Sequence, residues 1–292
     1  MKTLLDVLQS GAGYLAGKGV ENSRLVMEQL MAHSLKCPRL HLYLRFETAI
    51  PEDRLVTLRE GIKRIGAGEP LQYVLGDTEF MGRRFKTDKR ALIPRPDTES
   101  LVEAVLACAS LWALEKPVIV DVGSGSGCIV VSMALAKPQA DYRAVDVSEA
   151  ALSLARENAA GCGVSGRIHF QPGNLLADFV PVSLDAVVSN LPYITTEDCH
   201  CLPRHIREHE PMSALDGGPD GLELIRRLIT EARRVLRPGG WIFLEIGFDQ
   251  ADRVVDCLRT CGFSDSVVSK DLGNHDRVVQ AICRKGAEHG LS

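Results

Sequence analysis

The sequence predicts an α/β protein in which an open, mostly parallel sheet follows a small helical domain. Short runs of apolar, largely β-branched residues alternate with longer stretches in which apolar residues recur at helical spacing. This alternation is typical of parallel strands joined by crossover helices. Two of the short runs end in polar residues followed by glycine or proline, at Asp121 and at Asn190. The helical domain comes first, in residues 1–65, and a segment that resembles a β-hairpin joins it to the sheet.

The composition is that of an ordinary globular protein, with 45% hydrophobic residues in 292. A formal net charge of -4 gives no general basic field, so no direct nucleic-acid partner is expected, because phosphate contacts supply much of that affinity. Nine cysteines without the spacing of a disulfide framework favour a reducing compartment, so we expect a cytoplasmic protein. No apolar run approaches the roughly 18 residues of a membrane span, and no membrane association is expected.

Residues 1–65 form the expected helical domain. Pro51-Glu52-Asp53 places a proline and two acids where the first turn of a helix favours them. The domain contains no catalytic cluster, which favours a packing or partner-docking role, because amphipathic helices usually serve packing. Its periodic apolar residues are Leu4, Leu5, Leu8, Leu25, Met27, Leu30, Met31, Leu55, Leu58 and Ile62.

Residues 66–90 form the expected linker. Gly66, Gly68 and Pro70 interrupt the helical pattern. Strands are expected at 71–74 and 84–87, on either side of a turn at Met81-Gly82.

Residues 91–292 form the main domain. Strands are expected at 118–121, 144–146, 168–170, 186–189, 241–246, 264–269 and 277–283, and helices at 101–114, 222–236 and 251–260. Arg237-Pro238-Gly239-Gly240 is expected to form a turn.

A glycine-rich loop follows the first of these strands. A loop between a strand and a helix offers unpaired backbone N–H groups, and glycines let a ligand approach the backbone. The acid two residues before the first glycine differs from the dinucleotide-binding pattern and suits the ammonium group of a bound amino acid. The expected ligand-binding residues are Asp121, Gly123, Ser124, Gly125, Ser126 and Gly127.

A second acid, Asp146, ends the next strand about 20 residues later, where it suits the hydroxyl groups of a ribose. The alternative is that Asp146 caps the helix that begins near Ser148. The following strand leads to Gly173-Asn174-Leu175. There Asn174 could pair with the edge of an adenine and Leu175 could cover its face, although asparagine also favours a simple turn.

The fourth strand ends in Asn190-Leu191-Pro192-Tyr193. Open α/β sheets place their chemistry at such carboxyl ends, so this corner and the glycine loop are expected to face one crevice. The alternative interpretation is an ordinary turn that terminates the strand.

Two further polar segments have more than one interpretation. In Ile93 to Glu99, either Asp97 or Thr98 could cap the next helix.

The second segment could supply metal ligands from its cysteines and histidines, which are Cys199, His200, Cys201, His205 and His209. Zinc sites usually contain a C-x-x-C pair, which is missing here, so we expect no metal and instead a mobile lip over the pocket.

Together these segments resemble the HemK/PrmC family, which methylates the side-chain amide nitrogen (N5) of glutamine in peptide-chain release factors. The resemblance covers nearly the whole chain and includes the segments at 68–73, 93–99, 209–211 and 271–278. It implies a Rossmann-like class I S-adenosylmethionine-dependent methyltransferase domain with an antiparallel last strand. It also implies a helical substrate-docking domain, S-adenosyl-L-methionine as cofactor, S-adenosyl-L-homocysteine as product, and release factors as partners.

The family pattern has proline where this chain has Leu191. The same Asn-Leu-Pro-Tyr corner occurs in ribosomal RNA adenine dimethyltransferases. This corner leaves methylation of RNA adenine N6 as an alternative. Two further alternatives are glutamine methylation of a ribosomal protein and a non-catalytic nucleotide-binding module. The Ile93 to Glu99 segment favours release factors.

The chemistry of an amide suggests a role for each corner residue. An amide nitrogen is a poor nucleophile because its lone pair is delocalised into the carbonyl group. We expect Asn190 Oδ1 and the backbone carbonyl of Leu191 to accept the two substrate N–H groups and so orient the nitrogen. Pro192 would keep the turn rigid and Tyr193 would pack on the planar amide. Asn190 is also expected to contact the cofactor.

Overall fold

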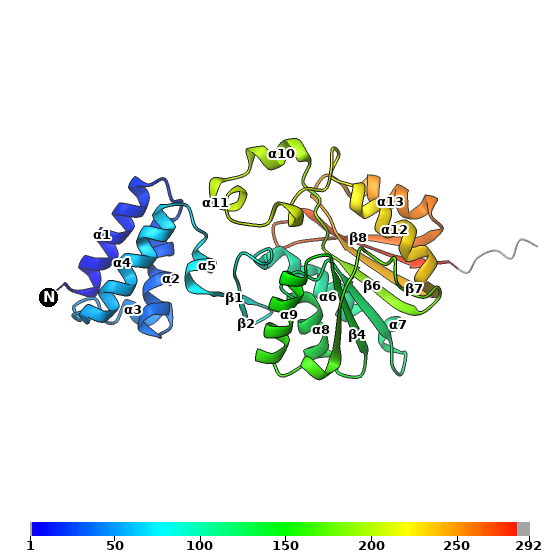
Figure 1. The fold of residues 1–292 in the computed structure, drawn as a ribbon, viewed down its shortest axis with the longest axis horizontal. Helices are drawn as coiled ribbons and strands as arrows, with labels where there is room; N and C mark the ends of the chain where they lie inside the picture. Colours follow the sequence, from blue (N-terminus) through cyan, green and yellow to red (C-terminus); the bar gives the residue numbers. More distant parts are fainter. Residues whose placement is uncertain (1, 285–292) are drawn as a thin grey trace, which may run out of the picture. The chain divides into compact units, whose positions relative to one another are not determined.

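The computed structural model describes residues 2–284, which form two compact units (Figure 1). The first runs to Asp77 and also includes Pro203–His209, and the second contains Thr78–Leu202 and the chain from Glu210 onward.

The first unit is helical, and its helices pack around a core of their own that includes Leu8, Leu15, Met27 and Met31. Thr3 and Asp6 form a reciprocal capping box at the start of the first helix. The helices are α1 (Leu4–Gly17), α2 (Ser23–Leu35), α3 (Arg39–Leu42), α4 (Glu52–Gly66), α5 (Leu71–Leu75) and α11 (Arg204–Arg207).

The expected β-hairpin is present, but its first strand is not where the sequence analysis placed it. The strands are β1 (Asp77–Phe80) and β2 (Arg83–Lys86), joined by a turn at Met81-Gly82. The strand expected at 71–74 is wrong, because these residues form α5. Pro70 directly precedes this helix and Gly76 ends it in a left-handed conformation. Leu71, Val74 and Leu75, at helical spacing, pack against the helical core.

The second unit is built on a seven-stranded sheet in the order β5-β4-β3-β6-β7-β9-β8. All neighbouring strands are parallel except β9, which is antiparallel to β7 and β8. This arrangement confirms the predicted α/β fold with an antiparallel last strand. The strands are β3 (Val118–Val122), β4 (Asp141–Asp146), β5 (Ile168–Pro172), β6 (Leu184–Ser189), β7 (Leu236–Glu245), β8 (Phe263–Lys270) and β9 (Asp276–Cys283).

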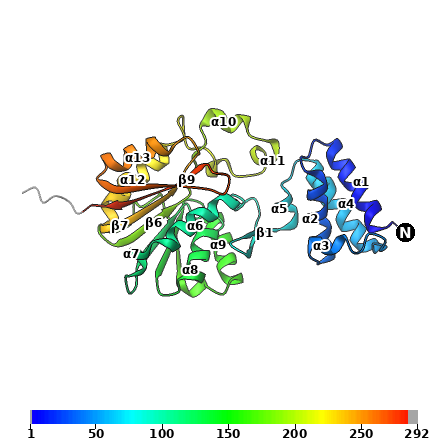
Figure 2. The ribbon, with the colours of Figure 1, turned by 180° about the vertical axis from the view of Figure 1, so that it is seen from behind.

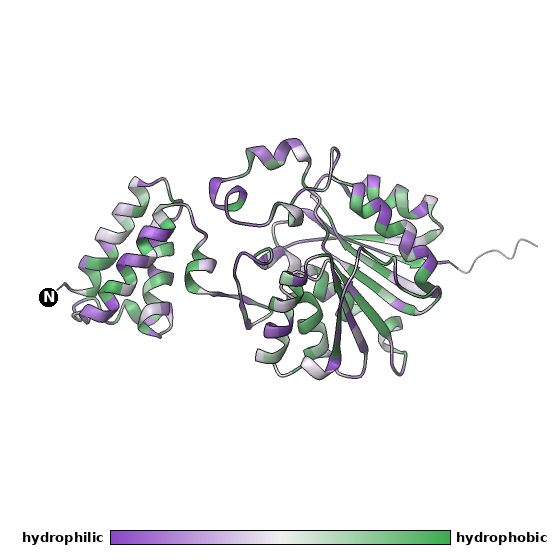
Figure 3. Ribbon diagram, in the orientation of Figure 1, coloured by the Kyte–Doolittle hydropathy of each residue, from purple (hydrophilic) through white to green (hydrophobic). Residues whose placement is uncertain are grey.

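Helices cover both faces of this sheet (Figure 2). The core on one face contains Val187 with α12 (Glu223–Val235) and α13 (Ala251–Thr260), and the core on the other contains Val188 with α6 (Glu99–Ala107) and α8 (Cys128–Ala136). The central strands are therefore hydrophobic on both sides, as buried parallel strands are (Figure 3). The remaining elements are η1 (Pro96–Thr98), α7 (Ala109–Trp112), α9 (Glu149–Gly161), η2 (Ser165–Arg167), α10 (Thr196–Cys201) and η3 (Met212–Ala214).

Two local predictions in this unit are wrong. Residues 237–240, which were expected to form a turn, lie within β7 and form a bulge in its pairing with β6. Leu236 pairs with Leu184, whereas Trp241 already pairs with Ala186. The helix expected at 101–114 is broken at Cys108 into α6 and α7. Within residues 2–284, no helix is long and apolar enough to span a membrane.

Candidate active site

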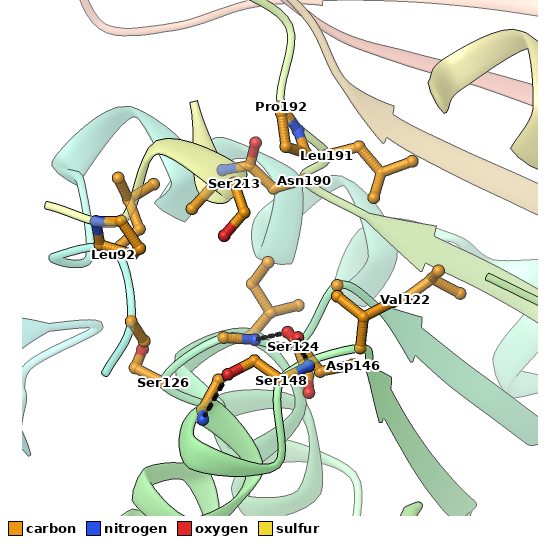
Figure 4. Close-up of a pocket in the computed structure, with 18 of the residues that line it drawn as sticks. Leu92, Val122, Ser124, Ser126, Asp146, Ser148, Asn190, Leu191, Pro192 and Ser213 are labelled. Carbon is orange, nitrogen blue, oxygen red and sulfur yellow. Dashed lines mark hydrogen bonds between the residues drawn. The ribbon is translucent and has the colours of Figure 1, made fainter. Parts of the chain in front are cut away.

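A cavity of about 430 Å³ lies in the second unit, at the carboxyl ends of β3, β4 and β6. The strand order reverses here, since β4 flanks β3 on one side and β6 flanks it on the other, and open sheets bind ligands at such a point. Figure 4 shows the corner residues facing Asp146 and the glycine loop across this space. The wall consists of residues 90–95, 98, 122–126, 128, 129, 145–148, 151, 173–175, 190–192, 211, 213, 214, 216 and 224.

The glycine loop has the backbone that the sequence pattern requires. Gly123, Gly125 and Gly127 all have positive φ, at 72°, 52° and 78°. Gly127 does not line the cavity, and its role is in packing, because a Cβ there would lie 2.9 Å from Ala155 Cβ on α9. Ser124 lines the cavity, and its buried hydroxyl has no hydrogen-bond partner among the described residues.

Asp146 lines the cavity at the end of β4. Its Oδ2 accepts from the backbone N–H of Gly125 at 2.9 Å, and its Oδ1 accepts from that of Ser148 at 2.8 Å. The alternative that Asp146 caps the next helix is wrong, because Ser148 is the capping residue of α9 and accepts from the N–H of Ala151.

Asp121 lies behind the loop, fully buried, and is not part of the cavity wall. Neither carboxylate oxygen meets a donor in good hydrogen-bond geometry within the described residues. Burial raises the pKa of Asp121 to about 7, and the negative charge of Asp146 adds to the increase.

Asn174 and Leu175 both line the cavity beyond β5. Asn174 also takes part in a turn, since its carbonyl accepts from the N–H of Ala177, and its Oδ1 accepts from Arg227 at 3.3 Å. Leu175 is held in the left-handed region, at φ 53°, with its side chain buried. Asn174 therefore lies in a turn and also lines the cavity, so the turn that the sequence suggested does not exclude a position in the site.

The corner places Asn190, Leu191 and Pro192 in the cavity wall. Asn190 Nδ2 donates to Thr98 Oγ1 at 3.2 Å, whereas its Oδ1 accepts no hydrogen bond from the described residues. Thr98 occupies the N-cap position of α6, as one of the two expectations had it, but its side chain makes no capping hydrogen bond, and Asp97 lies within η1.

Leu191 and Tyr193 contact the core next to the cavity. Leu191 is 6% exposed and belongs to the hydrophobic core on the α12 side of the sheet. Tyr193 does not line the cavity; its hydroxyl donates to Glu245 Oε1 at 3.3 Å. Burial, together with the negative charge of Glu245, raises the pKa of Tyr193. Gln250 Nε2 donates to the backbone carbonyl of Tyr193 at 2.9 Å, which fixes the chain after the corner.

Glu245 was not singled out by the sequence analysis. It is 2% exposed, at the end of β7, the neighbour of the strand that carries the corner. Burial raises the pKa of Glu245 to about 7, while the nearby Thr98 hydroxyl, the charge of Arg277 and the hydrogen bond from Tyr193 oppose the increase. The signal in the sequence was an acid in the last position of an apolar strand.

Glu210 joins two walls of the cavity, and it too had no predicted role. Its carboxylate accepts from the backbone N–H of Ile93 at 3.0 Å and from Arg95 Nη2 at 2.6 Å. Glu210 is 5% exposed and directly precedes Pro211, which lines the cavity, as do Ile93 and Arg95. The Ile93 to Glu99 segment is thereby held against the opposite wall.

The histidines and cysteines considered as metal ligands do not converge. Cys199 and Cys201 lie in the second unit, on α10, whereas His205 and His209 belong to the first. In the part of the chain that the structure describes, no three His, Cys, Asp or Glu side chains are placed to hold a metal ion.

Comparison with known proteins finds two family models along the chain: PrmC N-terminal domain at residues 6–76 and Methyltransferase small domain at residues 100–204. The release factor glutamine methyltransferase of Geobacter sulfurreducens is 40% identical, over 95% of this chain and 95% of its own. That of Moorella thermoacetica is 41% identical, over 97% and 99%. The chain belongs to the release factor glutamine methyltransferase family. The family resemblance inferred from the motifs is confirmed, and the protein is a methyltransferase of this family, whose fold implies dependence on S-adenosylmethionine.

Proposed function

We propose that this protein transfers a methyl group from S-adenosylmethionine to the side-chain amide nitrogen of a glutamine in a peptide-chain release factor, and so modulates translation termination. The observation that carries this proposal is the side-chain oxygen of Asn190, which accepts no hydrogen bond from residues 2–284 and lies in the same cavity as the glycine loop. The names of the relatives support the substrate.

The cavity residues fit S-adenosylmethionine. The backbone of the loop has positive φ values at Gly123 and Gly125, and the buried Ser124 Oγ between them has no hydrogen-bond partner within the described part of the chain. When bound, the cofactor supplies an electrophilic methyl group. Asp146 would accept from its ribose, and Asn174 and Leu175 would contact its adenine.

Asp121 would balance the ammonium group of the same cofactor. A fully buried carboxylate without a donor is a costly arrangement unless a positive group lies nearby. Because Asp121 lies behind the loop, outside the cavity wall, its effect would act through the loop backbone or after a small shift of the loop.

The corner would orient the substrate. Asn190 Oδ1 and the carbonyl of Leu191 would each accept one N–H of the glutamine amide, which leaves the nitrogen lone pair aimed into the cavity. Orientation and fixed dipoles then supply the rate, without a general base. Pro192 would limit the flexibility of the turn. Tyr193 could pack on the amide only after rearrangement, since its hydroxyl is bound to Glu245.

We further propose that the helical unit docks the release factor. The cavity is lined by residues of the second unit, and none of the residues in its wall belongs to the first. The helical unit has its own core, and exposes Leu40, Leu44 and Val56, which a partner could cover.

The test is methyl transfer from labelled S-adenosylmethionine to a purified release factor, with ribosomal RNA as the competing substrate. Mass spectrometry should find one methyl group on a glutamine of the release factor. Label on adenine of the RNA would instead support the alternative that the Asn-Leu-Pro-Tyr corner suggests. Cofactor binding by titration calorimetry without transfer to either substrate would support a nucleotide-binding module.

A further inference from the structure

Phe248 and Leu272 expose large apolar side chains at the edge of the sheet where the corner lies. Phe248 is 65% exposed, in the turn that follows β7, and Leu272 is fully exposed, in the turn between β8 and β9. β6 and β7 are parallel, and β9 runs antiparallel to β7. The end of β6, which carries the corner, therefore lies at the same edge of the sheet as the end of β7 and the start of β9.

Gln250 joins the turn of Phe248 to the corner. Gln250 is 3% exposed. Its Oε1 accepts from the backbone N–H of Gly247 at 2.9 Å, and its Nε2 donates to the backbone carbonyl of Tyr193 at 2.9 Å. One buried amide thus fixes the turn after β7 relative to the residues that are proposed to hold the substrate amide.

Arg277 holds the turn between β8 and β9 against the end of β7. Its Nε donates to Asp271 Oδ2 at 3.0 Å, and its Nη1 donates to the backbone carbonyl of Ile246 at 3.1 Å. The rings of Phe248 and His275 lie edge to face, with their centroids 6.1 Å apart. The two turns are therefore in contact, so their exposed apolar side chains belong to one surface and are not scattered singly over the protein.

Exposed carboxylates flank these apolar side chains. Asp249 directly follows Phe248, and its side chain makes no ion pair or hydrogen bond with any residue in the range 2–284. Asp97 is also exposed, and its Oδ2 lies 3.8 Å from Arg277 Nη2. A partner that covers this surface must therefore place polar or basic groups opposite these two acids.

The cations of the two turns are already paired. Arg277 is bound by Asp271 at 3.0 Å, and Lys270 Nζ lies 2.9 Å from Asp276 Oδ1. The surface therefore combines apolar side chains with a negative rim. Such a surface fits a partner segment that carries apolar and basic side chains.

We propose that Phe248 and Leu272 form the surface on which the release factor places the residues that flank its methylated glutamine, and that these flanking residues are apolar and basic. This inference rests on the proposed function, because the partner is taken to be the protein that carries the glutamine. Contact here buries apolar area away from the reacting atoms, so it supplies binding energy without taking part in the transfer.

The surface is within reach of a segment whose glutamine amide lies at the corner. Neighbouring strands such as β6 and β7 lie about 5 Å apart, and each residue of an extended chain spans about 3.5 Å. Residues only a few positions from the glutamine therefore reach the turn after β7 and the turn that contacts it.

The kinetic test measures KM and kcat for a purified release factor. Phe248→Ala should raise KM roughly tenfold and Leu272→Ala roughly threefold, with kcat and affinity for S-adenosylmethionine within about twofold of the parent. Phe248→Leu keeps much of the apolar area and should stay within about threefold of the parent KM. Val180→Ala is the matched control, because Val180 is 69% exposed but lies just before β6, at the opposite edge of the sheet. It should leave KM unchanged.

A charge reversal tests the negative rim. Asp249→Lys should raise KM roughly fivefold at low salt, and the difference should shrink as the ionic strength rises, because exposed charges are screened. Glu115→Lys is the control, since Glu115 is exposed just before β3, at the opposite edge. A lower KM in Asp249→Lys would overturn the assignment of basic flanking residues.

Photo-cross-linking identifies what covers the surface. The full-length protein with p-benzoylphenylalanine in place of Phe248 should cross-link to release-factor peptides that contain or adjoin the methylated glutamine. Cross-links only to distant parts of the release factor, or to a second copy of this chain, would overturn the proposal. So would a parent KM in both alanine variants while the release factor is methylated, and the proposed function would then stand. A parent protein that methylates no release factor would overturn the proposed function and this inference with it.

Discussion

The carboxylate of Asp146 accepts a hydrogen bond from the backbone N–H of Gly125 at 2.9 Å, which joins the end of β4 to the glycine loop. The same side chain also accepts from the N–H of Ser148. Two segments of the cavity wall are thus fixed by one carboxylate, and a ligand that binds here would meet a preorganised loop.

Replacing Asp146 by alanine should weaken S-adenosylmethionine binding by roughly 1–3 kcal/mol, the usual effect of leaving polar ligand groups unpaired. Titration calorimetry measures this. Asp141→Ala is the control, because Asp141 begins the same strand at its opposite end and should not affect binding. Equal affinity in the two variants would remove Asp146 from the site.

The raised pKa of Asp121 predicts a pH-dependent stability. A buried carboxyl that keeps its proton up to about pH 7 in the folded protein, but only to about pH 4 when unfolded, stabilises the fold at low pH and loses this contribution as the pH rises. Between pH 5 and pH 7, the unfolding free energy of the parent should therefore fall relative to that of Asp121→Asn, by roughly 2–3 kcal/mol. Urea unfolding at several pH values tests this. A difference between the two proteins that does not vary with pH would show that Asp121 titrates normally.

Glu210→Ala should lower the free energy of unfolding by roughly 2–4 kcal/mol, because it leaves the Ile93 N–H and Arg95 without their acceptor. Glu208→Ala is a close control, since Glu208 pairs with Arg204 at the surface and should cost less than about 1 kcal/mol. Chemical denaturation of the two variants and of the parent measures these changes in the free energy of unfolding. A loss for Glu210→Ala as small as that for Glu208→Ala would mean that the two cavity walls are held by other contacts.

The parts of the site that the sequence predicted are those that depend on where a strand ends. The glycine loop and the corner each follow a buried apolar run, and Val122 pairs with Ser189 in parallel register, so the two loops emerge side by side. Asp146 follows the next strand in the same way. The local sequence pattern and the geometry of parallel strands were enough to predict the positions of the glycine loop, the corner and Asp146.

The parts of the site that the sequence analysis missed depend on contacts between residues that are distant in sequence. Thr98 and Asn190 are 92 residues apart, and Glu210 and Ile93 are 117 apart. Thr98 looked like a helix cap because its neighbours fit a capping pattern, and only the fold shows that its hydroxyl faces the corner. The short apolar run at 71–74 was equally ambiguous, since periodicity over so few residues cannot separate a strand from a helix.

Leu191→Pro should keep methyl transfer within about tenfold of the parent, equivalent to about 1.4 kcal/mol. In the proposed mechanism the acceptor at this position is the main-chain carbonyl, and Pro192 already biases residue 191 toward the extended region that proline would occupy. The lost leucine packing should lower the melting temperature, because its side chain is buried in the core. Rate measurements with both the release factor and RNA are needed: a variant that gains preference for one over the other would mean that the Leu191 side chain selects the substrate.

The most direct test of the account is single-turnover methyl transfer to a release factor by Asn190→Ala, with cofactor affinity measured on the same protein. The change deletes the Asn190 side-chain oxygen, which accepts no hydrogen bond from the described residues and which we propose accepts from the substrate nitrogen. We predict a loss of roughly a hundredfold or more in rate, with S-adenosylmethionine affinity largely retained, as expected for removal of a preorganised polar group. An Asn190→Ala protein that binds cofactor and methylates the release factor at the rate of the parent would contradict it.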